Sequence, residues 1–276
     1  MRDDFAVIII SHGRPDCETV KTLKGCGYTG KMFVLVDDED KTLSEYKARY
    51  GDSLCIFTKE ENFDIGDNFG RPNTIATFAR NECWNVADEK KLKYFLMLDD
   101  DLKSISIRYE DDGSLRGKSV KDADKVFEAV CEFMDNTPVA CTGFGLPIDY
   151  IGGVFSTDDR HIMNAYVLRV SERFDFKGRY SEDTITPVLE CTAGKIFQKI
   201  QNIQMVFDVW TPQKKTKAGG CQEAYRDNDS YVLRFYAVMF APSCVVVRPS
   251  KNEGWDNTTK YHMAFPKIVS ERLKKA

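Results

Sequence analysis

The sequence predicts an α/β fold in which a mainly parallel central sheet is flanked by helices. Short apolar runs alternate with segments of helical spacing over the first hundred residues. The runs are apolar throughout, as expected for strands that are buried on both faces. Glycine, proline and acidic residues follow the runs and mark their ends. Strands are expected at residues 5–10, 31–36, 54–57 and 94–98, and helices at residues 16–25, 41–50 and 74–89.

Each of these elements has a local basis in the sequence. Phe5–Ile10 is followed by Gly13 and Pro15, which break the strand, and Gly25 ends the helix after it. Residues 74–89 carry apolar side chains at a spacing of three to four, which places them near one helix face. These side chains are Ile75, Phe78, Ala79, Cys83 and Val86. Strands that alternate with helices in this way are typical of a parallel sheet.

The second half is less regular. Strands are expected at residues 104–108, 139–144, 161–170, 204–209 and 244–247, and helices at residues 121–136, 186–202 and 231–237. Asp111-Asp112-Gly113 is expected to form a turn between two strands. The chain shows no internal repeat, low-complexity block or long linker, so we expect a single domain over residues 1–276.

Composition narrows the class of protein. Apolar residues make up 42% of the 276 residues and charged residues 30%, with a net charge of −4. This balance is that of a globular protein without a global basic signal for nucleic acid, although a local basic groove is compatible with it. No run of eighteen apolar residues and no signal-peptide pattern is present, so we expect no membrane partner and a cytoplasmic location. The nine cysteines lack a Cys-x-x-Cys pair, which argues against a zinc site or a disulfide framework.

Three consecutive carboxylates, Asp99, Asp100 and Asp101, follow the strand expected at residues 94–98. Ligands of open α/β sheets bind at the carboxyl ends of strands. The three charges repel one another, and their hard oxygens suit Mg²⁺ or Mn²⁺. On an extended segment, Asp99 and Asp101 would point the same way and jointly hold one ion. An acidic turn is the simpler alternative, and a phosphatase-like Asp-x-Asp is disfavoured because three strands come first.

Polar residues also follow the first two strands. Gly13 allows close approach of a ligand, and Arg14 can pair with phosphate as a planar fork. A turn with an exposed arginine is the alternative. Asp37 and Asp38 end the second strand, where a solvated acidic loop with Glu39 and Asp40 is equally compatible with the sequence.

The order of these features resembles the GT-A fold glycosyltransferases. The resembling segments are Val7–Pro15, Val34–Asp38, Arg80-Asn81, Leu98–Asp101 and Glu182-Asp183-Thr184. Within that superfamily the chain looks most like the phage TET-associated glycosyltransferases, which add sugars to hydroxymethylated pyrimidines in DNA. Enzymes that glycosylate polysaccharides or small molecules are the competing assignment, and a catalytically silent nucleotide-sugar or DNA-binding module is a third.

The resemblance implies a Rossmann-like GT-A domain with a nucleotide-sugar-binding half (1–110) and an acceptor-binding half (111–276). It implies Mn²⁺ or Mg²⁺, a nucleoside-diphosphate sugar such as UDP-glucose, and a DNA acceptor. The implied metal ligands are Asp99, Asp101 and the late His262. The implied donor-binding residues are Ser11, His12, Arg14, Asp37, Asp38, Arg80, Asp99 and Asp100.

A catalytic base is expected in the second half. Inverting transfer needs a carboxylate that takes the proton of the acceptor hydroxyl. Asp183 is the first candidate and Glu182 the second, whereas Ser181, Asp183 or Thr184 would instead serve as a helix cap. Weaker candidates for ligand contact are Arg71, Trp255 and the basic stretch at residues 214–220.

Overall fold

The architecture comes from a computed structural model that describes residues 1–59, 76–153, 155, 162–178, 180–208, 235, 237–249 and 259–263. Its strands are β1 (Phe5–Ile10), β2 (Lys31–Asp37), β3 (Leu54–Phe57), β4 (Tyr94–Asp99), β5 (Leu102–Asp111), β6 (Ser114–Ser119), β7 (Val139–Gly145), β8 (Ala165–Arg169), β9 (Ile196–Phe207), β10 (Val245–Pro249) and β11 (Thr259–Met263). Its α-helices are α1 (Glu18–Gly25), α2 (Leu43–Tyr50), α3 (Ala76–Glu89), α4 (Ala123–Asp135) and α5 (Glu182–Thr192). Short 3₁₀ helices are η1 (Gly51–Ser53), η2 (Pro147–Tyr150) and η3 (Val170–Glu172).

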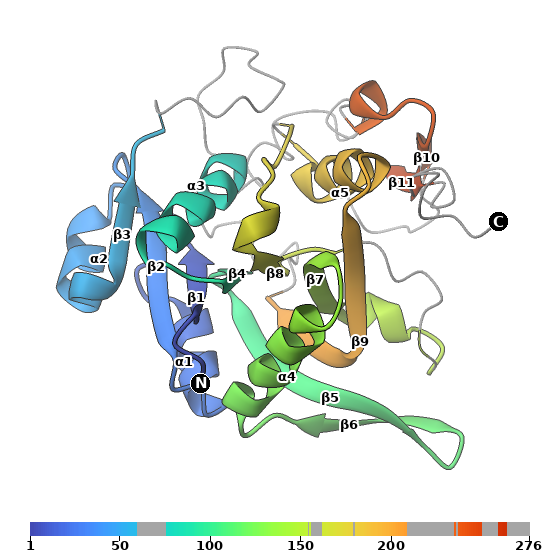
Figure 1. Ribbon diagram of the computed structural model, residues 1–276, viewed down its shortest axis with the longest axis horizontal. Helices are drawn as coiled ribbons and strands as arrows, with labels where there is room; N and C mark the ends of the chain where they lie inside the picture. Colours follow the sequence, from blue (N-terminus) through green and yellow to red (C-terminus); the bar gives the residue numbers. More distant parts are fainter. Residues whose placement is uncertain are drawn as a thin grey trace.

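A nine-stranded sheet in the order β3-β2-β1-β4-β8-β7-β9-β5-β6 forms the centre of the α/β fold (Figure 1). The first four strands in this order are parallel, as the sequence predicts. The prediction of a mainly parallel sheet is wrong for the rest. β8 runs antiparallel to β4 and β7, and β5 runs antiparallel to β6 and β9, so the sheet is mixed.

Two local features explain the mixed sheet. The predicted turn between strands is present, and its residues Asp112 and Gly113 both have positive φ, 49° and 70°. Such a turn reverses the chain within two residues and needs no helical crossover, so β5 and β6 pair as a hairpin. β9 is the second feature, because it pairs in parallel with β7 and then antiparallel with β5.

The sheet curls, because β4 and β5 are close in sequence and distant in strand order. Four strand spacings separate them, roughly 19 Å in a flat sheet. Asp99 and Leu102 are three residues apart, and three residues span at most about 11 Å. β9 therefore brings β5 back towards the carboxyl end of β4, where the backbone NH of Asp208 donates to the carbonyl of Asp101.

The two faces of the sheet bury separate apolar clusters. Phe5, Val7 and Ile9 of β1 pack with α1 and α4 on one face. Ala6 and Ile8 pack with α3 on the other face, where Trp84 is fully buried. β1 is buried at every position, in agreement with its apolar sequence. The core thus fixes the register of β1 and β4 at the centre of the fold.

One predicted helix is wrong. Residues 186–202 are divided between α5, which begins earlier at Glu182, and β9. Gly194 has a φ of +102° and lies just after the helix, where glycine ends helices at little steric cost. The expected strand at 161–170 is shorter, β8, and His161 lies outside the described residues, as does most of the segment 231–237.

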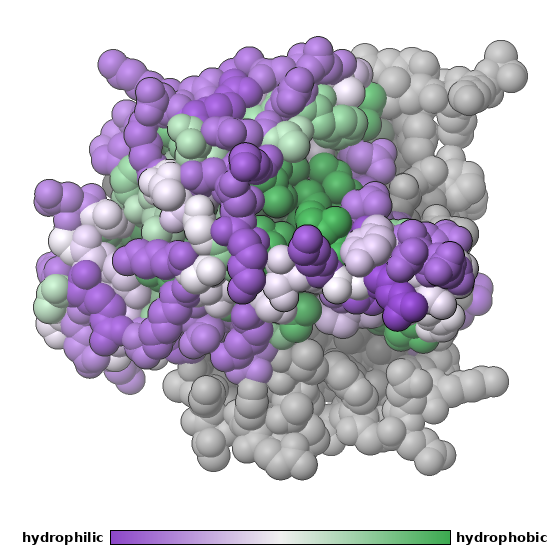
Figure 2. All heavy atoms as spheres, turned by 90° about the horizontal axis from the view of Figure 1, so that it is seen from below, coloured by the Kyte–Doolittle hydropathy of each residue, from purple (hydrophilic) through white to green (hydrophobic). Residues whose placement is uncertain are grey.

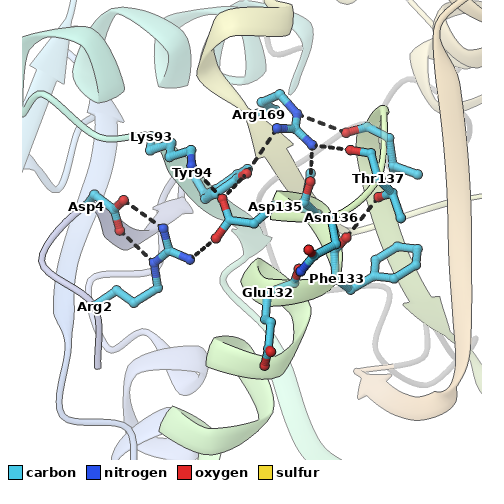
Figure 3. Close-up of polar contacts among 12 residues, drawn as sticks. Arg2, Asp4, Lys93, Tyr94, Glu132, Phe133, Asp135, Asn136, Thr137 and Arg169 are labelled. Atoms are coloured by element: carbon cyan, nitrogen blue, oxygen red, sulfur yellow. Dashed lines mark hydrogen bonds and ion pairs between the residues drawn. The ribbon is translucent and has the colours of Figure 1, made fainter.

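An ionic network ties together the amino ends of β1 and β4 (Figure 3). Asp135, at the end of α4, contacts Arg2 and Lys93 and accepts a hydrogen bond from Tyr94 Oη at 2.9 Å. Arg169, at the end of β8, donates to Tyr94 Oη at 3.1 Å and to backbone carbonyls that follow α4. Charged groups thus close this end of the sheet, opposite the carboxyl ends of β1 and β4.

Hydrophilic side chains cover much of the described surface when the molecule is seen from below the view of Figure 1, with hydrophobic ones near the centre (Figure 2). Among the described residues, no helix combines the length and apolar character needed to cross a membrane.

Candidate active site

The parallel strands bring three predicted segments to one edge of the sheet. β1 lies between β2 and β4, with Ile10 opposite Leu35 on one side and Asp99 on the other. The residues that follow these strands therefore meet at the carboxyl edge. The chain entering β8 lies beside them, since the backbone NH of Asp99 donates to the carbonyl of Asn164.

The three carboxylates after β4 have different surroundings. The chain turns at Asp100 and Asp101, so the segment is not extended. The expectation that the side chains of Asp99 and Asp101 point the same way assumed an extended segment and therefore no longer follows. Asp100 is buried, where it accepts a hydrogen bond from Ser11 Oγ at 2.6 Å and pairs with Arg14 Nη2 at 3.0 Å. Asp101 is partly exposed, with Arg14 Nη1 3.8 Å away.

These carboxylates share an excess of negative charge. Burial raises the pKa of Asp100 to about 6, although Arg14 and Ser11 act to lower it. Burial, together with the charges of Asp99 and Asp100, raises the pKa of Asp101 to about 7. Burial also raises the pKa of Asp99. Each of the three carboxylates has a buried Oδ1 without a hydrogen-bond partner within the described part of the chain. Oxygen ligands of this kind fit a divalent Mg²⁺ or Mn²⁺ ion.

A second polar group, His12, Asp37 and Asp40, lies where β1 and β2 end. Among the described residues these three alone meet the geometry of a possible metal site, with ligand atoms within 4.8 Å of one another. His12 Nδ1 lies 2.7 Å from Asp37 Oδ2, and Lys59 Nζ lies 2.8 Å from Asp37 Oδ1. Asp37 is therefore already paired with Lys59 and in hydrogen-bond contact with His12.

Asp40 is also occupied by protein donors. Its Oδ2 accepts from the backbone NH of Gly13 at 2.7 Å, and its Oδ1 accepts from Thr42. The hydrogen bond that Asp37 accepts from the imidazole raises the pKa of His12. These contacts favour a structural link between the ends of β1 and β2 over a metal site. Asp37 and Asp40 are buried, whereas Asp38 is exposed, so only part of this segment is a solvated loop.

The predicted catalytic carboxylates approach the same edge from α5. Glu182 and Asp183 occupy the first turn of that helix, after Ser181 at the N-cap. Arg80 of α3 lies between them and β4, with Nη2 3.3 Å from Asp99 Oδ1 and Nε 3.1 Å from Glu182 Oε1. The charge of Asp183 contributes to the raised pKa of Asp99, so the two carboxylates are within electrostatic reach.

The structure adds residues that the sequence did not single out. Tyr46 of α2 is fully buried, and its hydroxyl lies 2.6 Å from Ser11 Oγ and accepts from the backbone NH of Arg14 at 2.9 Å. Lys59 and Tyr166 are the others, the latter lying 5.2 Å from the Arg80 guanidinium. An aromatic residue in the middle of a short, mainly polar helix is the only sequence signal for Tyr46.

Some predicted residues have another place or are not described. The side-chain amide of Asn81 bonds to the backbone of Phe176, which is a structural contact. His262 lies on β11, opposite Val246, and its side chain is outside the described part. Arg71, Trp255 and the basic stretch 214–220 also lie outside the described residues. Their predicted roles, like those of the placed residues, remain predictions.

Comparison with known proteins identifies the class of protein to which the chain belongs. A glycosyltransferase family model matches residues 5–219, most of the chain. The chain belongs to the TET-associated glycosyltransferase family. No curated protein matches it.

A solved structure of CMP:2-keto-3-deoxy-manno-octonic acid synthetase complexed with CTP is similar at 9% identity. The match covers 81% of this chain and 97% of that one, with a TM-score of 0.42. Similarity at this level has no bearing on activity.

Proposed function

We propose that this glycosyltransferase has a GT-A fold and transfers a hexose, by default glucose, from a nucleoside-diphosphate sugar in a metal-dependent reaction. The favoured acceptor is the hydroxyl of a 5-hydroxymethylpyrimidine in DNA, modified in the cytoplasm. One observation carries the proposal: Asp99–Asp101 and the Glu182–Asp183 pair lie at the same sheet edge, linked through Arg80.

Asp101 is the first ligand proposed for Mg²⁺ or Mn²⁺, because it is partly exposed and its Oδ1 lacks a partner among the described residues. Asp99 is the second proposed ligand, and His262 is the third ligand that the family resemblance implies. A bound divalent ion supplies positive charge to the departing diphosphate.

The proposed donor site lies along the ends of β1 and β2. Arg14 is partly exposed and already directed at the carboxylates, so its guanidinium can reach a phosphate that a metal ion holds there. Ser11 and His12 belong to the same segment after β1, and Asp37 and Asp38 lie at the end of the neighbouring strand β2. We assign these residues to the nucleotide part of the donor.

In the transfer step, the acceptor hydroxyl oxygen forms a bond to the sugar anomeric carbon. The bond from that carbon to the diphosphate oxygen breaks, and its electron pair leaves with the nucleoside diphosphate. In an inverting reaction Asp183 takes the hydroxyl proton. The partial burial of Asp99 and Asp101 lowers the local dielectric constant, which strengthens charge interactions there.

The DNA acceptor rests on the family rather than on a basic surface. Family membership is the main support, because the net charge of −4 offers no global attraction to phosphate. A base in a duplex would have to be extruded to reach a site at the sheet edge, and aromatic residues stabilise extruded bases by stacking.

The proposal is tested by incubating the protein with labelled UDP-glucose, Mn²⁺ and either of two DNA substrates that differ only in hydroxymethylation. We expect label in the hydroxymethylated DNA alone, and none after chelation of the metal. Equal or absent labelling of both DNAs would exclude the DNA acceptor. Donor hydrolysis without DNA labelling would favour a polysaccharide or small-molecule acceptor, and donor binding without hydrolysis would favour a silent module.

A further inference from the structure

One face of α3 is bonded to the segment that leads into α5. Thr77, Arg80 and Asn81 are spaced by three and four residues, so they share this face, and all three are buried. Thr77 Oγ1 donates to the carbonyl of Gly178 at 2.8 Å. Asn81 exchanges two hydrogen bonds with the backbone of Phe176, at 2.6 and 3.1 Å. The segment before α5 therefore has a fixed position on α3.

Arg80 extends this contact to the carboxylates. Its side chain is 4% exposed and lies over the rings of Tyr166 and Phe176. Nη2 faces Asp99 at the end of β4, and Nε faces Glu182 in the first turn of α5. A single guanidinium thus joins a carboxylate of the first half of the chain to one of the second half.

The chemistry of this bridge is specific to arginine. A guanidinium is planar and presents donors in several directions, whereas lysine offers one compact charge. Glu182 is buried and Asp99 is partly buried, so leaving either without its cation would be costly, and most of all Glu182. Two aromatic rings have their centroids 5.2 and 6.0 Å from the guanidinium carbon, which restricts the movement of the Arg80 side chain and so favours both contacts.

We infer that Arg80 is a positioning residue that holds the first turn of α5, and with it Asp183, at a set place relative to the carboxylates after β4. Glu182 is then the counter-ion of Arg80, and Asp183 is the carboxylate that acts on the acceptor. Besides any contact with a ligand, Asp99 forms an ion pair with Arg80 through its Oδ1. This inference rests on the proposed function and refines the roles of three predicted residues.

The kinetic test compares Arg80→Gln, Arg80→Lys and the control Thr77→Val, which removes one hydrogen bond of the same helix face without touching Asp99 or Glu182. A displacement of about 1 Å in reacting groups costs roughly 100-fold in rate. We expect Arg80→Gln to lower kcat by about that factor, with the Kd for Mn²⁺–UDP within about threefold of wild type. Arg80→Lys should recover only part of kcat, and Thr77→Val should keep kcat near wild type.

Two kinetic results would overturn the inference. A loss confined to donor affinity, with kcat unchanged, would make Arg80 a donor-binding residue. An equal loss of kcat in Thr77→Val would reduce Arg80 to one of several structural contacts.

A stability cycle separates the bridge from the reaction. We expect Arg80→Gln and Glu182→Gln each to lower the unfolding midpoint, and the double variant to lose less than the sum of the two shifts. Additive shifts would overturn the bridge itself. If the wild-type protein transfers no sugar to any acceptor, the proposed function fails, whereas this cycle still decides whether Arg80 couples the two carboxylates.

Discussion

Arg14 Nη2 lies 3.0 Å from Asp100 Oδ1, which joins the segment after β1 to the turn after β4. Ser11 Oγ donates to the other oxygen of the same carboxylate at 2.6 Å. Asp100 therefore has protein partners on both oxygens. Oδ1 of Asp100 and Oδ1 of Asp101 are both buried without a hydrogen-bond partner among the described residues, but the Arg14 guanidinium lies 3.0 Å from the first, whereas the ion pair of Asp101 is longer, at 3.8 Å, and involves its other oxygen. Of the two, Asp101 is the better position for an added cation.

Asp101→Asn is expected to abolish metal-dependent donor hydrolysis and sugar transfer. An amide cannot supply the negative charge that a divalent ion requires of its first ligand. We expect the Kd for Mn²⁺ to rise at least about tenfold, measured by calorimetry. Asp112→Asn is the matched control, because Asp112 is an exposed turn residue whose positive φ asparagine tolerates. Full hydrolysis and transfer by Asp101→Asn would show that the metal assignment is wrong.

Metal binding should strengthen as pH rises. Asp100 and Asp101 have folded-state pKa values of about 6 and about 7, above the ordinary 3.8, so the folded protein binds more protons than the unfolded chain between those limits. The metal-free protein therefore loses stability as pH rises from about 4 to about 7. Protons compete with the cation in the same window, so Mn²⁺ should bind about tenfold more tightly near pH 8 than near pH 6.

The measurements for this prediction are unfolding midpoints in chelator and Mn²⁺ titrations across that pH range. Asp101→Asn should flatten both profiles, because it removes the carboxyl group with the larger shift. A Kd for Mn²⁺ that stays constant from pH 6 to pH 8, or a metal-free midpoint that rises there, would contradict the assignment.

Asp183→Asn is expected to lower kcat by about 100- to 10,000-fold, the usual contribution of a positioned base. Donor affinity should hardly change, because Asp183 acts on the acceptor side. Single-turnover assays with the modified DNA, alongside calorimetry with Mn²⁺–UDP, separate the two effects. Asp175→Asn serves as the control, since Asp175 is a partly exposed carboxylate just before α5. Wild-type kcat in Asp183→Asn would remove it from the mechanism.

Gly145→Ala is expected to destabilise the fold by about 1–3 kcal/mol. A Cβ at Gly145 would lie 1.9 Å from Tyr150 Oη, which donates to the carbonyl of Gln201 at 2.6 Å. Tyr150 would have to leave that hydrogen bond. Gly25→Ala, at the end of α1, meets no atom within 4 Å and should be neutral or slightly stabilising. Urea unfolding of both variants tests this contrast, and equal stabilities would refute it.

The first half of the fold was predictable because its signals are local. Buried parallel strands such as β1 and β4 are continuous apolar runs, and glycine and proline mark their ends. The misassigned helix shows where local signals conflict. Residues 196–200 have an apolar spacing compatible with a helix, but Phe197 and Lys199 are buried in alternation, which is the period of a strand. Gly194, read as a helix end, would have separated the two elements.

The mixed part of the sheet and the bridge across the site were not predictable in this way. Ser106 of β5 pairs with Gln204, about a hundred residues later, and neither segment contains a local sequence signal that predicts this pairing. Arg80 is 102 residues from Glu182, and arginine is ordinarily exposed, so its sequence position favours a surface role. Strand ends predicted which segments meet, but the specific pairings come from tertiary packing.

The strand order also constrains the sequence of events in folding. β1 to β4 need only the first 99 residues, so the parallel half can assemble while the chain is still being synthesised. The β5–β6 hairpin forms locally but has no sheet neighbour until β9 is present, because β9 separates it from β7. We therefore expect Asp99 and Asp101 to lie at the boundary between an early unit and a late one, with the carboxylate turn completed only when Phe207 pairs with Leu102.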